Sequence, residues 1–381
     1  MRYRKLGKTG LEVSEIGFGG EWLERHTTDE CVELIHHAKN CGINILDCWM
    51  ANPVVRKNIG EGICDDRAHW HIQGHIGSTW KDGQYVRSRD VDECKYAFED
   101  LLNGLKTDYI DLGMIHYIDE QKELERVLDS DYLAYVHDLK RQGIIRHIGM
   151  STHNPKIAIQ AVEHNLVEMM LFSVNPAFDM LPATEDLDEV FNETYSDPNL
   201  NGINKERDYL YKLCEQNRVG LTVMKGFAGG RLFDASQSPF GVALTPLQCI
   251  HYALTRPAVV SIMVGFDKPE HIDEAVSYES ASAEEKDYAA VLANAPRHSY
   301  IGQCTYCGHC APCPKGIDIA MVNKLYDLAT MQSEVPESIR QHYSDMSAHA
   351  YDCIACHACE SRCPFGVVIA DRMKQAASLF R

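Results

Sequence analysis

Eight short apolar runs, each followed by a longer segment with helical patterning, fill the chain up to about residue 280 and constrain its fold more than any other feature. Strand and helix units that repeat with right-handed crossovers close most naturally into a (β/α)8 TIM barrel, an α/β fold. An open doubly wound sheet is the alternative, but no GxGxxG turn follows the first run. The expected strands are residues 13–20, 43–48, 69–77, 109–117, 145–152, 167–175, 220–227 and 259–266.

The helical segments and connections divide the chain further. Thr27 and Glu30 have the spacing of a capping box, and Pro246 suits the first turn of a helix. The connection at 176–204 is unusually long, which is typical of a functional lid or of a disordered insertion. The composition changes near residues 296–300, so we place the barrel in residues 1–297 and a second domain in 298–381.

The second domain contains two cysteine runs of similar spacing, which differ in that two residues precede the fourth cysteine of the first run and three precede that of the second. CTYCGHCAPCP begins at residue 304 and CIACHACESRCP at residue 353, and each has three cysteines two residues apart, then a fourth cysteine and a proline. In two-cluster ferredoxins three thiolates of a run bind one cluster and the fourth binds the other. We therefore expect a mainly helical, ferredoxin-like iron–sulfur domain with two [4Fe–4S] clusters. The predicted ligands are Cys304, Cys307, Cys310 and Cys363 for one cluster, and Cys353, Cys356, Cys359 and Cys313 for the other.

The distribution of the 15 cysteines also indicates metal binding, because eight of them crowd into residues 304–363. Zinc also binds pairs of cysteines two residues apart, but the third and fourth cysteine of each run favour iron–sulfur clusters. The N-terminal MRYRKLGKTG lacks the apolar core of a signal peptide. A cytoplasmic protein with metal-bound thiolates is therefore expected rather than a disulfide scaffold.

The charge and hydrophobicity of the chain restrict its partners. A net charge of -18 disfavours nucleic acid and anionic membrane surfaces. The sequence has no run of about eighteen apolar residues that could span a membrane. The expected partners are a small-molecule substrate and an external redox partner for the iron–sulfur domain.

Polar side chains gather at the C-terminal ends of the expected strands, where (β/α)8 barrels keep their chemistry. Because side chains alternate along a strand, His75 shares a face with His71 and Gln73, but only His75 reaches the mouth. His69 and His71 are expected to be structural. One carboxylate, several imidazoles, an amide and an amine at one mouth predict acid–base chemistry. The strand-end residues are Asp47, His75, His116, Ser151, His153, Asn175, Lys225 and Gly265.

Six segments spread over nearly the whole chain form a recognisable set: YRKLGKTGLEVSEIGFGG, GINILD, YIDLGMIHY, GIIRHIGMSTHN, VMKGFAGGRL and VGFDKPEHIDEA. Together they resemble the aldo-keto reductase superfamily, and specifically the branch that carries a C-terminal ferredoxin-like domain with a CTxCGxCxPCP run. The resemblance implies a catalytic tetrad of Asp, Tyr, Lys and His, in which Asp47 and His116 match. Asn52 stands in place of the proton-donating tyrosine, and His75 in place of the lysine that lowers the tyrosine's pKa.

The same resemblance implies a nucleotide site along the mouth, whose candidate contacts are Ser151, Asn175, Lys225, Gly265, Lys268 and Glu274. Asn175 stands in place of the family's glutamine, and Met224 in place of the aromatic residue that stacks on nicotinamide. Lys268 could meet a phosphate and Glu274 the adenine. Ala275, however, replaces the usual asparagine, and Asp267 would repel a 2′-phosphate. NAD(P)H is therefore a candidate cofactor that the sequence does not require.

Three hypotheses for the function follow. A nicotinamide delivers a hydride, whereas a [4Fe–4S] cluster passes single electrons. In the first hypothesis the ferredoxin-like domain passes electrons to a carbonyl or conjugated substrate, while Asp47, His75 and His116 handle protons, as an unperturbed imidazole pKa of about 6.5 allows. The second is an NAD(P)H-dependent aldo-keto reductase with a modified tetrad, in which a histidine or a loop tyrosine such as Tyr195 supplies the proton. The third is a hydrolase or lyase with a metal on Asp47, His75 and His116.

Overall fold

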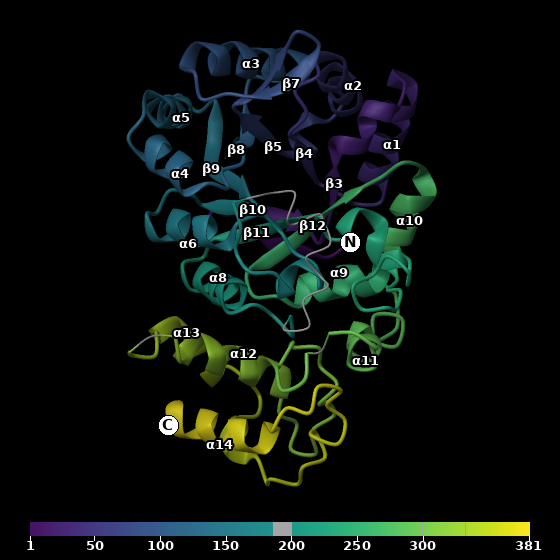
Figure 1. The fold of residues 1–381 in the computed structure, drawn as a ribbon, viewed down its shortest axis with the longest axis vertical. Coiled ribbons are helices and arrows are strands. Elements are labelled where there is room, and N and C mark those ends of the chain that lie inside the picture. The colour runs from purple at the N-terminus through teal and green to yellow at the C-terminus, as the bar shows by residue number, and fades with distance from the viewer. Residues whose placement is uncertain (186–199, 299, 332) are drawn as a thin grey trace.

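The computed structural model describes residues 1–185, 200–298, 300–331 and 333–381, and its central feature is a closed barrel of eight strands (Figure 1). All neighbouring strands of the barrel pair in parallel. Every run predicted to form a strand contains one barrel strand, so the predicted (β/α)8 barrel is confirmed. The strands are β3 (Ile16–Gly19), β4 (Ile45–Cys48), β5 (His71–Ile76), β8 (Ile110–Ile115), β9 (Ile145–Thr152), β10 (Met169–Ser173), β11 (Gly220–Met224) and β12 (Val259–Gly265).

The strand β5 begins later than predicted. A 3-10 turn, η2 (Arg67–His69), contains His69, whose Nε2 lies 2.8 Å from the carbonyl oxygen of Ile43. The backbone closes this turn through a 3.1 Å hydrogen bond from His69 N to Asp66 O, so the strand starts at His71. His71 Nδ1 in turn lies 3.8 Å from Asp111 Oδ1. Both histidines are therefore at the end of the barrel opposite the mouth.

Two antiparallel hairpins lie outside the barrel sheet. β1 (Tyr3–Lys5) pairs with β2 (Glu12–Ser14) beside the N-terminal ends of the barrel strands. β6 (Ser78–Lys81) pairs with β7 (Gln84–Arg87) and follows directly after the C-terminal end of β5. The second hairpin was not predicted, and it adds side chains to the mouth of the barrel.

Helices surround the barrel (Figure 1), and their start signals agree with the sequence. The capping box of Thr27 and Glu30 is present, and Pro246 occupies the first turn of its helix. The helices are α1 (Thr28–Asn40), α2 (Pro53–Ile63), α3 (Val91–Gly104), α4 (Gln121–Leu128), α5 (Asp131–Arg141), α6 (Pro155–Glu163), α8 (Lys205–Gln216), α9 (Pro246–Thr255), α10 (Pro269–Ser277), α11 (Tyr288–Ala293), α12 (Ile319–Ala329), α13 (Glu337–Ser344) and α14 (Ile369–Leu379). Further 3-10 turns are η1 (Gly20–Arg25), η3 (Phe178–Met180), η5 (Ala228–Phe233) and η6 (Ala350–Asp352).

Apolar side chains fill the barrel interior below its mouth. Leu6 and Val13 from the N-terminal hairpin region join this interior cluster, so apolar packing closes the N-terminal end of the barrel. Polar chemistry is therefore left to the C-terminal end. The other members of the cluster are Ile45, Leu112, Met114, Met169, Leu171, Val260 and Met263.

The C-terminal segment packs against one side of the barrel, next to α8, α9 and α11 (Figure 1). Ile203 N donates a 2.8 Å hydrogen bond to Gln303 Oε1, and Gln216 Nε2 donates a 2.7 Å bond to Leu328 O. Residues 186–199, which hold Tyr195 and half of the long connection predicted to be a lid or an insertion, lie outside the described residues. None of the helices in the described ranges is long and apolar enough to cross a membrane.

Candidate functional site

A cavity of about 850 Å³ opens at the C-terminal ends of the barrel strands. Most of the residues predicted for the mouth line it, so the strand-end prediction located the cavity correctly. The predicted residues that line it are Asp47, His75, His116, Ser151, His153, Lys225, Gly265 and Glu274.

A chain of hydrogen bonds crosses the mouth from Asp47 to Tyr85. Asp47 Oδ1 lies 3.0 Å from His75 Nε2, and His75 Nδ1 lies 2.8 Å from His116 Nδ1. His116 Nε2 lies 2.6 Å from the hydroxyl oxygen of Tyr85. The first three side chains are buried, and Tyr85 is half-buried in the cavity wall. We call these four residues the relay.

The relay has one consistent direction when Asp47 is ionised and both imidazoles are neutral. Burial, with the neighbouring His75 and Arg89, holds the pKa of His116 well below its usual value, and burial raises the pKa of Tyr85. A neutral imidazole has one donor and one acceptor nitrogen. Tyr85 therefore donates to His116 Nε2, His116 Nδ1–H donates to His75 Nδ1, and His75 Nε2–H donates to Asp47.

Neighbouring side chains fix the Asp47 end of the relay. Gln73 Nε2 donates a 2.8 Å hydrogen bond to Asp47 Oδ1, and Thr222 Oγ1 donates a 2.7 Å bond to Gln73 Oε1. All three side chains are buried. Because two donors point at one oxygen of Asp47, the arrangement suits an ionised carboxylate.

The hairpin of β6 and β7 positions Tyr85. Arg89, just beyond the hairpin, donates to the carbonyl oxygens of His116 and Tyr117, the latter at 2.9 Å. Trp49 packs edge-on against the Tyr85 ring, with the centroids 5.5 Å apart. Sequence reasoning missed Tyr85, although STWKDGQYVR has a signal that could have found it. An Asp-Gly pair between alternating residues is typical of a two-residue hairpin, and both central residues have positive φ, 52° at Asp82 and 75° at Gly83.

A second acid–base pair lies at the same mouth. His153 Nδ1 lies 3.0 Å from Asp119 Oδ2, and His153 lines the cavity. Asp119 also accepts hydrogen bonds from His153 N and Thr152 Oγ1, at 2.7 and 2.8 Å. Burial opposes ionisation of Asp119, but these hydrogen bonds and the charge of His153 leave its pKa below the usual value.

Three of the predicted residues do not line the cavity, and local structure explains two of them. Asn52 caps α2, where its side chain accepts a 3.0 Å hydrogen bond from Val54 N. Asn175 is fully buried; it accepts from Ala177 N at 2.9 Å and donates to Lys225 O at 2.8 Å. Lys268 occupies the residue before α10. Asx caps and turns of this kind are common where a strand passes into a helix.

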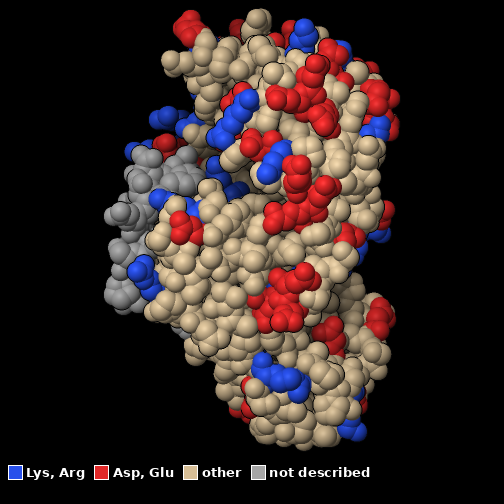
Figure 2. Space-filling view, turned by 90° about the vertical axis from the view of Figure 1, so that its right-hand side faces the viewer, with Lys and Arg blue, Asp and Glu red and all other residues tan. Residues whose placement is uncertain are grey.

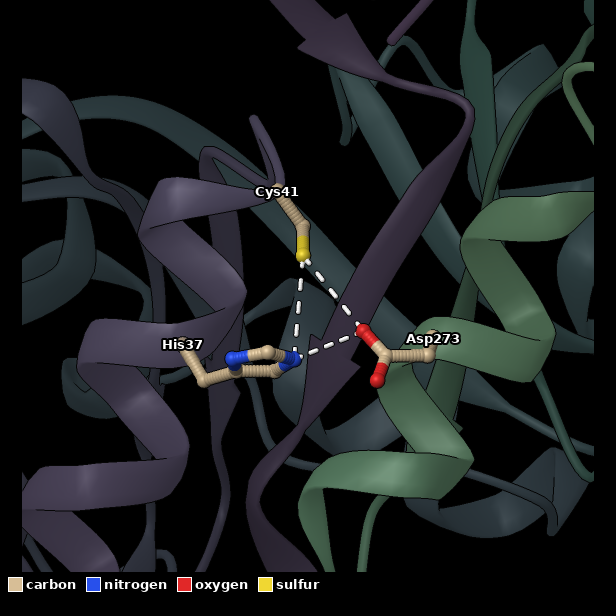
Figure 3. A group of neighbouring side chains, drawn as sticks. All are labelled: His37, Cys41 and Asp273. Atoms are coloured by element: carbon tan, nitrogen blue, oxygen red, sulfur yellow. Dashed lines mark hydrogen bonds and ion pairs between the residues drawn. The ribbon is translucent and has the colours of Figure 1, made fainter.

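Asp47, His75 and His116 form a row and do not surround one point, because His75 uses one ring nitrogen toward each neighbour. Among the described residues, the group whose ligand atoms all lie close enough for one ion is His37, Cys41 and Asp273 (Figure 3). Its His37 Nε2 and Asp273 Oδ1 are 2.7 Å apart. If both atoms bound one tetrahedral zinc ion, they would be about 3.3 Å apart. The observed distance is shorter, so a direct hydrogen bond between His37 and Asp273 links α1 to α10.

The two cysteine runs enclose two cavities, each lined by four cysteines. The inner cavity is lined by Cys304, Cys307, Cys310 and Cys363. The outer cavity is lined by Cys313, Cys353, Cys356 and Cys359. The fourth cysteine of each run thus lies with the other run, which is the arrangement of two-cluster ferredoxins.

N–H groups near the thiols add to this fit. Ala355 N donates to Cys353 Sγ at 3.4 Å, and Asn323 Nδ2 donates to Cys304 Sγ at 3.5 Å. Hydrogen bonds to cysteine sulfur stabilise the thiolate form and tune the potential of a bound iron–sulfur cluster. The donor set therefore suits iron–sulfur clusters.

A closed (β/α)8 barrel with an acid–base mouth, joined to a segment with two four-cysteine cavities, defines an oxidoreductase with an iron–sulfur domain. Residues 15–243 match the aldo/keto reductase family, and residues 303–368 match a 4Fe-4S dicluster domain. The chain belongs to the aldo/keto reductase family and carries a C-terminal 4Fe-4S dicluster domain.

Curated relatives support the same family. The uncharacterized oxidoreductase YqkF of Bacillus subtilis is 27% identical over 292 residues, which are 74% of this chain and 92% of that protein. The L-galactose dehydrogenase of Arabidopsis thaliana is 28% identical over 156 residues, 39% of this chain and 47% of that protein.

Solved structures show the same barrel. The holo form of aldo-keto reductase AKR11C1 from Bacillus halodurans aligns with a TM-score of 0.57 at 20% identity, over 75% of this chain and 94% of that chain. A putative aldo-keto reductase from Pseudomonas aeruginosa aligns with a TM-score of 0.54 at 22% identity, over 72% of this chain and 93% of that chain.

Proposed function

We propose that the protein is an iron–sulfur oxidoreductase that reduces a small carbonyl or conjugated organic substrate in the barrel mouth, with protons supplied by the relay. The observation that carries this proposal is the unbroken chain from Asp47 through His75 and His116 to Tyr85 on the cavity wall. Acid–base groups placed in this way suit a substrate that gains protons as it is reduced.

The relay can carry one proton more than in the arrangement described above. With Asp47 protonated, every hydrogen bond reverses: Asp47 donates to His75, His75 to His116, and His116 to the Tyr85 oxygen. The Tyr85 hydroxyl proton then points into the cavity. When Tyr85 passes that proton to the substrate, each bond returns to its first direction. The relay therefore delivers one proton at a time and reloads at Asp47.

Reduction of a carbonyl to an alcohol consumes two electrons and two protons. Clusters held by the inner and outer cysteines would supply the electrons one at a time. A relay that delivers single protons matches this stoichiometry, because each electron can be accompanied by one proton from Tyr85. His153, held by Asp119, is a second proton donor within the same cavity.

Close contacts join the cysteine domain to the mouth. Phe365 lines the inner cavity, and its ring centroid lies 6.0 Å from that of Tyr300. The Tyr300 hydroxyl donates to Pro176 O, next to Asn175, which donates to Lys225 O. Lys225 lines the mouth. These buried contacts support a function in which the domain and the mouth work together.

A reoxidation experiment tests the proposal. Anaerobically purified protein is reduced with dithionite, desalted and mixed with a panel of aldehydes, ketones and enones, while its visible absorbance and the products are followed. We expect at least one compound to reoxidise the protein and to appear as its reduced product. Turnover of that compound at an unchanged rate after removal of the iron would contradict the proposal.

An NAD(P)H-dependent carbonyl reductase is the second candidate, and the length of the mouth cavity favours it. The cavity runs from Tyr85 past Gly265 to Glu274 and Ala275, and its 850 Å³ exceeds what a small carbonyl compound fills. Fluorescence titration with NADPH and NADH tests this candidate. Absence of binding at millimolar concentration would remove it.

A further inference from the structure

The two cysteine cavities differ in what surrounds them. Residues that line the inner cavity contact the barrel: Thr305 O accepts a 3.0 Å hydrogen bond from the Tyr288 hydroxyl, and His309 Nε2 lies 2.8 Å from Asp287 Oδ2. Three cysteines of the outer cavity belong to the segment that leads into α14, and the yellow loop before α14 lies at the end of the molecule away from the barrel (Figure 1). Of these cysteines, Cys356 is exposed, and the neighbouring Ile354 is 58% exposed.

The exposed rim of the outer cavity is apolar and basic. Its lining residues include Ile354, Lys315 and Arg362 but no Asp or Glu, although the chain has 55 acidic and only 37 basic residues. Figure 2 shows acidic side chains gathered over the barrel on one face, whereas the lower part of that face is mostly uncharged. The nearby carboxylate of Glu360 already has two partners. Its Oε2 lies 2.8 Å from His357 Nδ1, and its Oε1 accepts a 2.7 Å hydrogen bond from Ala370 N.

We infer that the rim of the outer cavity, centred on Ile354 and Lys315, is the docking surface for a small acidic ferredoxin-type protein that donates single electrons. This inference rests on the proposed function, because it names the source of the electrons. In each encounter the donor loses one electron and the iron–sulfur domain gains one, and no bond forms or breaks.

Exposure and charge both support this assignment. Electron transfer between protein-bound centres slows steeply with distance, so an external protein donor has to approach the exposed outer cavity and not the inner one. Electron-transfer encounters use small interfaces and are steered by opposite charges. An acidic partner would meet the exposed Lys315 beside the apolar Ile354, whereas the half-buried Arg362 donates to the carbonyl oxygens of Cys310 and Pro312. Ferredoxins pass single electrons through iron–sulfur clusters, which suits a domain of the same chemistry.

Binding of a fluorescently labelled acidic two-cluster ferredoxin to the anaerobic, cluster-loaded protein tests the inference. Ile354→Glu and Lys315→Glu should each raise the Kd by about tenfold. Val54→Glu, which places the same charge on a 63% exposed residue of α2, should leave the Kd unchanged. The Kd of the unmodified protein should rise with salt concentration. Iron content and visible spectra report whether each variant keeps its clusters.

Reduction kinetics give a second readout. Ferredoxin should reduce the two rim variants more slowly than the unmodified protein, whereas dithionite should reduce all of them at the same rate. Equal Kd values for all variants, binding of flavodoxin in place of ferredoxin, or a rim that instead joins two copies of the chain in sedimentation would each overturn the inference. If ferredoxin fails to dock while carbonyl compounds still reoxidise the dithionite-reduced protein, only this inference falls and the proposed function stands.

Discussion

His75 stands between Asp47 and His116, with its Nε2 3.0 Å from Asp47 Oδ1 and its Nδ1 2.8 Å from His116 Nδ1. Each ring nitrogen of His75 has one partner. A neutral His75 that takes up a proton at one nitrogen can therefore pass the proton on its other nitrogen to the partner there. His75 therefore links the carboxylate of Asp47 to the rest of the mouth.

Removal of His75 should interrupt the relay. In His75→Leu, Asp47 can no longer reload His116, and we expect substrate-dependent reoxidation to slow by about 10²-fold or more. His71→Leu, in the same strand but at the opposite end from the mouth, is the control. Similar losses in the two variants would show that the effect is structural.

The low pKa of His116 predicts a pH-dependent stability. The unfolded chain binds a proton on this imidazole below about pH 6.5, but the folded protein does so only at lower pH, because burial disfavours the charged form. The free energy of unfolding should therefore fall as the pH drops below 6.5, by up to about 1.4 kcal/mol per pH unit from this group. His116→Gln should lessen this slope in thermal unfolding between pH 7.5 and 5.5. An unchanged slope would count against a neutral His116.

Thr222 should contribute to stability and to the orientation of Asp47. Thr222→Val removes the hydroxyl that donates to Gln73 Oε1 and leaves a buried acceptor without that donor. We expect a loss of about 1–3 kcal/mol in the free energy of unfolding, together with slower reoxidation. Thr330→Val, at the exposed end of α12, should change neither quantity. Full stability and activity in Thr222→Val would contradict the ordering role of Gln73.

Pairs of cysteine substitutions test the crossed ligand assignment. Cys304→Ser with Cys363→Ser removes two thiols from the inner cavity and should leave about four of about eight irons per chain. Cys304→Ser with Cys313→Ser removes one thiol from each cavity and should affect both clusters. Iron and sulfide analysis after anaerobic purification distinguishes the two pairs. The control is Cys64→Ser, which replaces an exposed cysteine of the barrel. If Cys304→Ser with Cys313→Ser left about four irons while Cys304→Ser with Cys363→Ser affected both clusters, each run would bind its own cluster.

Long-range periodicity and cysteine spacing were sufficient to predict most of the fold. Most residues of the barrel strands are buried, so each strand appears in the sequence as an apolar run. The fourth cysteine of each run lies beside the other run, as the ferredoxin-like spacing predicts. Strand order then brought Asp47, His75 and His116 together at one mouth. These features depend on patterns that extend over many residues.

The parts that were not predicted depend on local structure. Tyr85 reaches His116 only because the Asp82–Gly83 turn folds β6 and β7 back over the mouth. Asn52 and Asn175 occupy positions at strand ends but use their side chains for backbone hydrogen bonds. Strand position alone cannot separate a side chain that faces a cavity from one that caps a turn.

The most direct test of the central claim is a single-turnover reoxidation measured with the unmodified protein and with Tyr85→Phe, both reduced with dithionite and matched in iron content. The phenylalanine keeps the ring against Trp49 but has no proton to pass to the substrate. The account predicts that reoxidation by a carbonyl compound slows by about 10²-fold or more in the variant, while its visible spectrum is unchanged. Equal reoxidation rates in the two proteins would contradict it.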